Sequence, residues 1–83
     1  MKKHVKNYLK HFSLEKGDYI ACEYCRKTAV DIHHIIFKSQ GGTDEPKNLI
    51  GLCRKCHQRA HGIGDTIDRY VLLLITKKRD SEI

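Results

Sequence analysis

The sequence predicts a small α+β domain, in which two short strands and a helix form the core and a further helix flanks it at each end. Three observations support this class. The chain has 83 residues, which is enough for one domain. Apolar residues recur at helical spacing in some segments and in β-branched runs in others, without an internal repeat. Four cysteines form two matched pairs, and a core this small needs such a cross-link.

The first predicted element is an amphipathic helix over residues 2–12, which the turn-forming residues 13–17 should end. Its apolar residues are Val5, Tyr8, Leu9 and Phe12. Residues 18–29 contain the first cysteine pair and should form a knuckle. The next segment, residues 30–37, is rich in β-branched and aromatic side chains and is typical of a strand.

Residues 38–47 include two glycines and a proline and predict a loop, and residues 48–52 predict a short second strand. A helix should follow over residues 54–61, because good helix formers precede Gly62. Asp65 is then expected to cap a last helix. The apolar face predicted for that helix consists of Ile67, Tyr70, Val71, Leu74 and Ile75. On periodicity alone, the centre of this segment fits a strand equally well.

Composition and charge narrow the functional classes. The longest uncharged apolar run, residues 71–75, is far shorter than the ~20 residues that span a bilayer, and no signal-peptide pattern follows the basic start. These features argue against an integral membrane protein, a secreted preprotein and a multidomain enzyme. The formal net charge is +6, which favours a polyanionic partner such as nucleic acid. A generic solubilising charge is the alternative.

The cysteines occur as Cys22-x-x-Cys25 and Cys53-x-x-Cys56. Each pair places two thiolates on one tight turn, and two pairs complete a closed tetrahedral zinc shell. Three alternatives are less consistent with the sequence. Disulfides lack any sign of export, a redox motif lacks a βαβ context and would not occur twice, and unrelated buried cysteines would not fall into matched pairs. The expected cofactor is structural Zn²⁺.

Four histidines indicate a second metal site. His57 and His61 are four residues apart and share one face of the predicted helix, while His33 and His34 end the first predicted strand. One strand histidine would supply a third nitrogen and leave coordination positions open, as in catalytic metal sites. Alternatively, each could be a surface residue or support the zinc shell, and His57 could replace a cysteine in that shell.

Together, these segments resemble the HNH endonuclease signature. In order, they are Asp31-Ile32-His33-His34-Ile35, Gly41-Gly42, Asn48-Leu49-Ile50 and Leu52-Cys53-x-x-Cys56-His57-x-x-x-His61. The resemblance covers about residues 20–62. It implies the ββα-metal nuclease fold, in the variant with a zinc knuckle of two CxxC pairs, within a single nuclease domain over residues 1–83.

The resemblance also implies residue roles. His34 would be the general base, Asn48 would hold that base in orientation, and His33, His57 and His61 would bind one catalytic divalent ion. Many members of the family have Asp-His in place of the two strand histidines. An all-imidazole site favours Mn²⁺, Ni²⁺ or Zn²⁺ over Mg²⁺. Asp31 could be a rival ligand or could orient a ligating imidazole.

The leading hypothesis is therefore a metal-dependent endonuclease that hydrolyses phosphodiester bonds in DNA with little sequence preference. Basic residues near the ligand helix would contact the backbone: Lys38, Arg54, Lys55 and Arg59. The resemblance further implies a cytoplasmic protein of bacterial or phage origin, working alone or beside a packaging or restriction partner. Alternatives are a non-catalytic zinc-binding module for nucleic acid and a protein–protein adaptor that uses the last helix.

Overall fold

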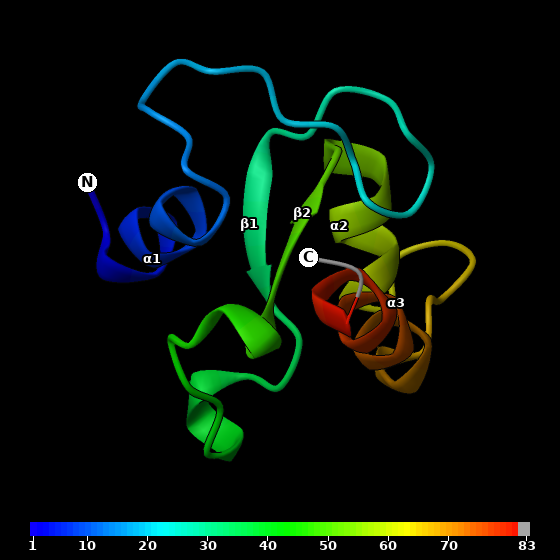
Figure 1. Ribbon diagram of the computed structural model, residues 1–83. Helices are drawn as coiled ribbons and strands as arrows, with labels where there is room; N and C mark the ends of the chain where they lie inside the picture. Colours follow the sequence, from blue (N-terminus) through cyan, green and yellow to red (C-terminus); the bar gives the residue numbers. More distant parts are fainter. Residues whose placement is uncertain (82–83) are drawn as a thin grey trace.

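Two antiparallel strands form the centre of the fold, with helices on both sides of them (Figure 1). The computed structural model describes residues 1–81. The elements are α1 (Lys3–His11), β1 (Asp31–His34), η1 (Lys38–Gln40), η2 (Pro46–Asn48), β2 (Leu49–Leu52), α2 (Arg54–Ala60) and α3 (Arg69–Ser81). Helix α1 lies on one side of the strands, and α2 and α3 lie on the other. The predicted α+β class and the order of helices and strands are confirmed.

Strand β2 is buried on both faces because helices cover each side of the sheet. Leu49, Ile50 and Leu52 have no exposed surface. A Cβ atom at Gly51 would lie 3.0 Å from the Tyr8 hydroxyl and 3.1 Å from Ile20 Cγ2, so the glycine permits α1 to pack closely. The hydrophobic core cluster lies toward α2 and α3 and contains Cys22, Ile35, Ile50, Leu52, Cys53, Cys56, Ile67 and Leu72.

Strand β1 is shorter than the predicted strand over residues 30–37. It pairs with β2 from Asp31, opposite Leu52, to His34, opposite Leu49. After His34, the Ile35 N–H still donates to the backbone carbonyl of Asn48 at 2.9 Å. The next N–H group, that of Ile36, donates instead to the Asn48 side chain, to Oδ1 at 2.8 Å. The backbone then leaves the sheet and enters the loop that contains η1 and η2.

Helix α3 corrects the prediction in two respects. It begins at Arg69, because Asp68 Oδ1 accepts the Tyr70 N–H at 2.8 Å and thereby takes the capping role expected of Asp65. Its predicted apolar face is right only in part. Ile67 and Ile75 pack in or against the core, whereas Tyr70 and Leu74 are 63% and 66% exposed and the helix buries Leu72 instead. Consecutive apolar residues from position 70 onward left the inward face undetermined by periodicity.

A largely but not fully buried ion pair joins α3 to the knuckle and to the strands. Arg79 Nη1 lies 3.0 Å from Glu23 Oε1, and the same guanidinium donates to the carbonyl groups of Leu49 and Pro46 at 3.0 and 2.9 Å. The second oxygen of Glu23 accepts the Tyr8 hydroxyl at 2.6 Å and the Gly51 N–H at 2.9 Å. One carboxylate thus connects α1, β2 and α3.

We expect Arg79→Ala to destabilise the chain by about 2 kcal/mol, because the largely buried Glu23 carboxylate would lose its cationic partner. Urea unfolding of the metal-loaded chain, followed by circular dichroism, would measure this change. Lys78→Ala is the matched control, since Lys78 is an exposed cation on the same helix. Equal destabilisation by both substitutions would show that the ion pair does not hold α3 in place.

Candidate functional site

The four cysteine sulfurs meet between the knuckle and the start of α2. Their Sγ atoms all lie within 4.8 Å of one another, and the Sγ atoms of Cys25 and Cys53 are 3.6 Å apart. A tetrahedral Zn²⁺ with Zn–S bonds of about 2.3 Å separates its sulfurs by about 3.8 Å. The Cys25 and Cys56 N–H groups donate to the first sulfur of each pair, Cys22 Sγ at 3.5 Å and Cys53 Sγ at 3.4 Å. The residues therefore fit a closed zinc site.

Backbone donors also favour the thiolate form of one cysteine. Burial alone would raise the pKa of Cys22, but hydrogen bonds from the backbone N–H groups of Cys25, Cys53 and Tyr24 outweigh it and lower this pKa to about 7. A thiolate is the form that binds metal. The same knuckle is closed by an isolated antiparallel β-bridge between Ala21 and Thr28, as expected of a turn that presents two sulfurs to one point.

His33, His57 and His61 converge from β1 and α2, and we call them the imidazole cluster. One nitrogen from each ring lies within 4.8 Å of the others, and the Nε2 atoms of His57 and His61 are 3.1 Å apart. Nitrogens bound to one tetrahedral zinc lie about 3.3 Å apart, so the cluster fits a single ion. Phe37 stacks on His61 with ring centroids 5.0 Å apart and closes one side. This residue was not predicted from the sequence.

The surroundings of His33 favour its neutral ring, and a neighbouring carboxylate orients His57. His33 is only 3% exposed, and its burial, followed by the nearby His57 and His61, lowers its pKa to about 4. Asp31 Oδ2 lies 3.0 Å from His57 Nδ1 and 3.1 Å from Arg54 Nε. Asp31 therefore occupies the outer nitrogen of His57 and leaves Nε2 turned toward the cluster.

His34 lies apart from the imidazole cluster, because neighbouring strand residues point to opposite faces. Its Nε2 atom is 2.8 Å from Asp44 Oδ1, and its ring lies 4.4 Å from the ring of His4, measured between centroids. The bond from His34, followed by that from Lys38, lowers the pKa of Asp44. Neither His4 nor Asp44 was predicted as a site residue, and no local motif connects them to His34 in the sequence.

One surface hollow of about 370 Å³ joins the two histidine groups. Side chains of the imidazole cluster and His34 line the same space, together with Lys2, His4, Ile32, Phe37 and Lys38. A phosphate in this hollow would meet the imidazole cluster on one side and His34, which is outside that cluster, on the other. Its lysines supply the positive charge that such a ligand requires.

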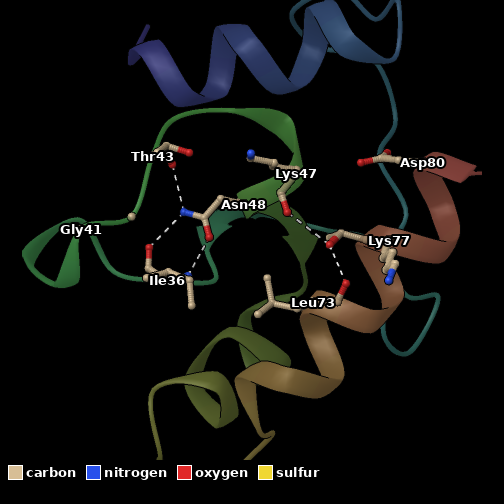
Figure 2. A pocket seen from close by; sticks show the side chains of 10 residues that line it. Ile36, Gly41, Thr43, Lys47, Asn48, Leu73, Lys77 and Asp80 are labelled. Atoms are coloured by element: carbon tan, nitrogen blue, oxygen red, sulfur yellow. Dashed lines mark hydrogen bonds between the residues drawn. The ribbon is translucent and has the colours of Figure 1, made fainter.

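Asn48 acts on the backbone beside His34. Its Oδ1 accepts the Ile36 N–H, and its Nδ2 donates to the carbonyl groups of Ile36 at 3.0 Å and Thr43 at 2.9 Å (Figure 2). These three bonds fix the loop that carries Asp44 against the end of β1. The bonded residues Ile36, Thr43 and Asn48 also line one side of a pocket of about 450 Å³ between this loop and α3. Leu73, Thr76 and Lys77 line it from the helix side.

The basic residues predicted to contact nucleic acid have different environments. Lys38 lines the hollow and lies 3.1 Å from Asp44 Oδ2. Arg54 pairs with Asp31, as described above. Arg59 donates to the Asp65 carbonyl at 2.7 Å and lies over the Tyr24 ring, whereas Lys55 is exposed. Of these four residues, only Lys38 borders the hollow that the histidines share.

Comparison with known proteins gives a consistent set of matches. A family model described as HNH endonuclease matches residues 22–62. The chain is 36% identical over 50 residues to the type IV methyl-directed restriction enzyme EcoKMcrA of Escherichia coli strain K12, covering 48% of this chain and 18% of that protein. It is 36% identical over 59 residues to the probable mobile endonuclease C of Enterobacteria phage T4, covering 64% and 28%. No solved structure gives a significant match.

The chain thus spans less than a third of the length of either relative. Across residues 1–81, the structure has no helix with the length and apolar character needed to cross a membrane.

We expect Gly42→Ala to destabilise the chain by about 3 kcal/mol, because the new Cβ would overlap the Ile36 carbonyl and break its bond to Asn48. Gly41→Ala is the control in the same loop. Gly41 has a φ of +87° and open space around it, so alanine there should cost about 1 kcal/mol of backbone strain. Urea midpoints of the two variants would test this order, and a larger loss for Gly41→Ala would contradict it.

Proposed function

Residues 22–62 belong to the HNH endonuclease family, and on that basis we propose that the chain is a nuclease domain that hydrolyses phosphodiester bonds in DNA. In this proposal His34 is the general base and the imidazole cluster holds one catalytic divalent ion. The observation that carries the proposal is the convergence of His33, His57 and His61 on one point, beside a hollow that His34 also lines.

Asp44 fixes the orientation and the tautomer of the His34 ring. A carboxylate at Nε2 accepts the proton of that nitrogen, which leaves the lone pair of the neutral ring on Nδ1. His34 Nδ1 would take a proton from the attacking water as the new P–O bond forms and the bond to the 3′ oxygen breaks. Asn48 supports this step indirectly, because it holds the backbone on both sides of the His34–Asp44 pair.

The imidazole cluster offers nitrogen ligands, so Mn²⁺, Ni²⁺ and Zn²⁺ suit it better than Mg²⁺. An ion bound there would act as a Lewis acid on the phosphate and its leaving oxygen. Asp31 keeps His57 turned toward the cluster through Nδ1. Lys38, Arg54, Lys55 and Arg59 are proposed to contact phosphates, and Lys2 joins them because it lines the hollow.

We expect His34→Ala to slow the nicking of supercoiled plasmid by about 100-fold or more, the usual cost of removing a general base. Nicking would be assayed with Mn²⁺, Ni²⁺, Zn²⁺ and Mg²⁺ in turn. His11→Ala is the matched control, because His11 is an exposed histidine of α1 that pairs with Asp80 outside the hollow. Circular dichroism would establish that both variants remain folded.

The proposal fails if the wild-type chain nicks with none of these ions, or if His34→Ala nicks as fast as His11→Ala. Salt-dependent DNA binding without cleavage, together with a single metal equivalent per chain, would instead identify a non-catalytic zinc-binding module. We further propose that the nuclease works alone or beside a packaging or restriction partner.

We also propose that the four cysteines hold a structural Zn²⁺. Structural zinc contributes on the order of 10 kcal/mol, which exceeds the stability expected of a domain this small, so Cys53→Ser or a strong chelator should unfold the chain. Metal analysis and circular dichroism would measure this. The double variant His57→Ala/His61→Ala is the control, because it should keep one tightly bound zinc and its helices. A chelated chain that remains folded would refute a structural role for the metal.

A further inference from the structure

A second group of metal-ligating side chains lies beside the imidazole cluster without sharing a residue with it. His4 comes from α1, His34 from the end of β1, and Asp44 from the loop between η1 and η2. One ligand atom from each lies within 4.8 Å of the other two. We call these three residues the His4 triad. Side chains from three separate elements therefore meet at one point on the rim of the hollow.

Contacts around the His4 triad hold it in this arrangement. The Asn7 side chain on α1 donates to the Asp44 carbonyl at 2.9 Å, which ties the helix of His4 to the loop of Asp44. Asn48 fixes the same loop through Thr43. The rings of His4 and His34 are 4.4 Å apart and tilted by 46°. A ligand would thus find the three side chains already assembled, which lowers the cost of binding.

The chemistry of the His4 triad matches zinc-like ions. Two imidazole nitrogens and one carboxylate oxygen, with further positions open, form a ligand set that Zn²⁺ accepts, whereas Mg²⁺ and Ca²⁺ prefer oxygen ligands. A hollow of about 330 Å³ reaches the triad from solvent. The side chains of His34 and Asp44 are 18% and 15% exposed, so both remain accessible.

Nearby lysines oppose cation binding at the His4 triad. Lys2, Lys3 and Lys38 line the 330 Å³ hollow that reaches the triad. The Lys38 ammonium lies 3.1 Å from Asp44 Oδ2. Asp44 Oδ1 stays directed at His34. We therefore expect a site that is weaker than the four thiolates and that fills only when zinc is in excess.

We propose that the His4 triad is a second zinc site and that its occupation inhibits hydrolysis. Inhibition rests on the proposed function of His34, whereas zinc binding does not. Zinc bound at His34 Nε2 displaces the proton that this nitrogen shares with Asp44, and a neutral ring then carries its single proton on Nδ1, which it takes from solvent as the displaced proton is released. The ring can then no longer accept a proton from water. Zinc in excess would in this way remove the general base while the imidazole cluster remains intact.

Binding would be tested on the double variant His57→Ala/His61→Ala, which lacks the imidazole cluster. With its cysteines already loaded with zinc, this chain should take up one further Zn²⁺ in isothermal titration calorimetry. Adding His4→Ala should weaken this binding at least about tenfold, since even residues that only support metal ligands cost 10–100-fold in affinity. Adding Lys38→Ala should strengthen it by removing the competing ammonium. The absence of a further equivalent, or an affinity that His4→Ala leaves unchanged, would overturn the site.

Inhibition would be tested by titrating Zn²⁺ into plasmid-nicking reactions supported by Mn²⁺. Each variant is compared with its own rate before zinc is added, so that only the response to zinc matters. His4→Ala should need at least about tenfold more zinc than the wild type for the same fractional loss. Displacement of Mn²⁺ from the imidazole cluster would affect both chains alike, so coincident curves would refute inhibition through the triad.

The two arms also separate this inference from the proposed nuclease. A wild-type chain that never nicks would overturn both the nuclease and the inhibition, while the calorimetry would still decide whether the triad binds zinc.

Discussion

The meeting of the four cysteine sulfurs determines where the helix that carries His57 and His61 begins. Cys53 belongs to that cluster and is also the residue before α2, where its sulfur accepts the Cys56 N–H. Once the first turn of a helix is fixed, the direction of every later side chain follows from its rise and rotation. The two histidines one and two turns on are thereby aimed at β1. The position of the cysteine sulfurs therefore also determines the position of the imidazoles on α2, although the two sites are separate.

The adjacent histidines of β1 illustrate how a strand assigns different environments to identical side chains. His33 faces α2 and is buried among other imidazoles, whereas His34 faces α1 and meets a carboxylate. The alternation of side chains along a strand accounts for this difference. Because of this alternation, His33 presents a nitrogen to the imidazole cluster, where a metal could bind, and His34 presents its ring to Asp44. Both histidines line the same hollow.

Local spacing in the sequence predicted much of this arrangement, and contacts between distant segments account for what it missed. The order of elements, the cysteine cluster and the meeting of His33, His57 and His61 follow from paired motifs whose spacing is set by turns and by the helical repeat. Asp44 and His4 have no such signal, because they reach His34 only through loop and helix packing. The inward face of α3 depended in the same way on a distant partner, since Arg79 points inward to Glu23.

Helix α1 lies outside the segment matched by the family model but packs on it. The segment matched by the family model begins at residue 22, yet α1 covers one face of β2, supplies Tyr8 to the Glu23 carboxylate and places Lys2 and His4 at the hollow. A fragment cut to the matched boundaries would expose apolar surface along the strand and would lose one wall of the site. In this chain, the stretch that resembles other proteins is therefore smaller than the stretch that must fold together.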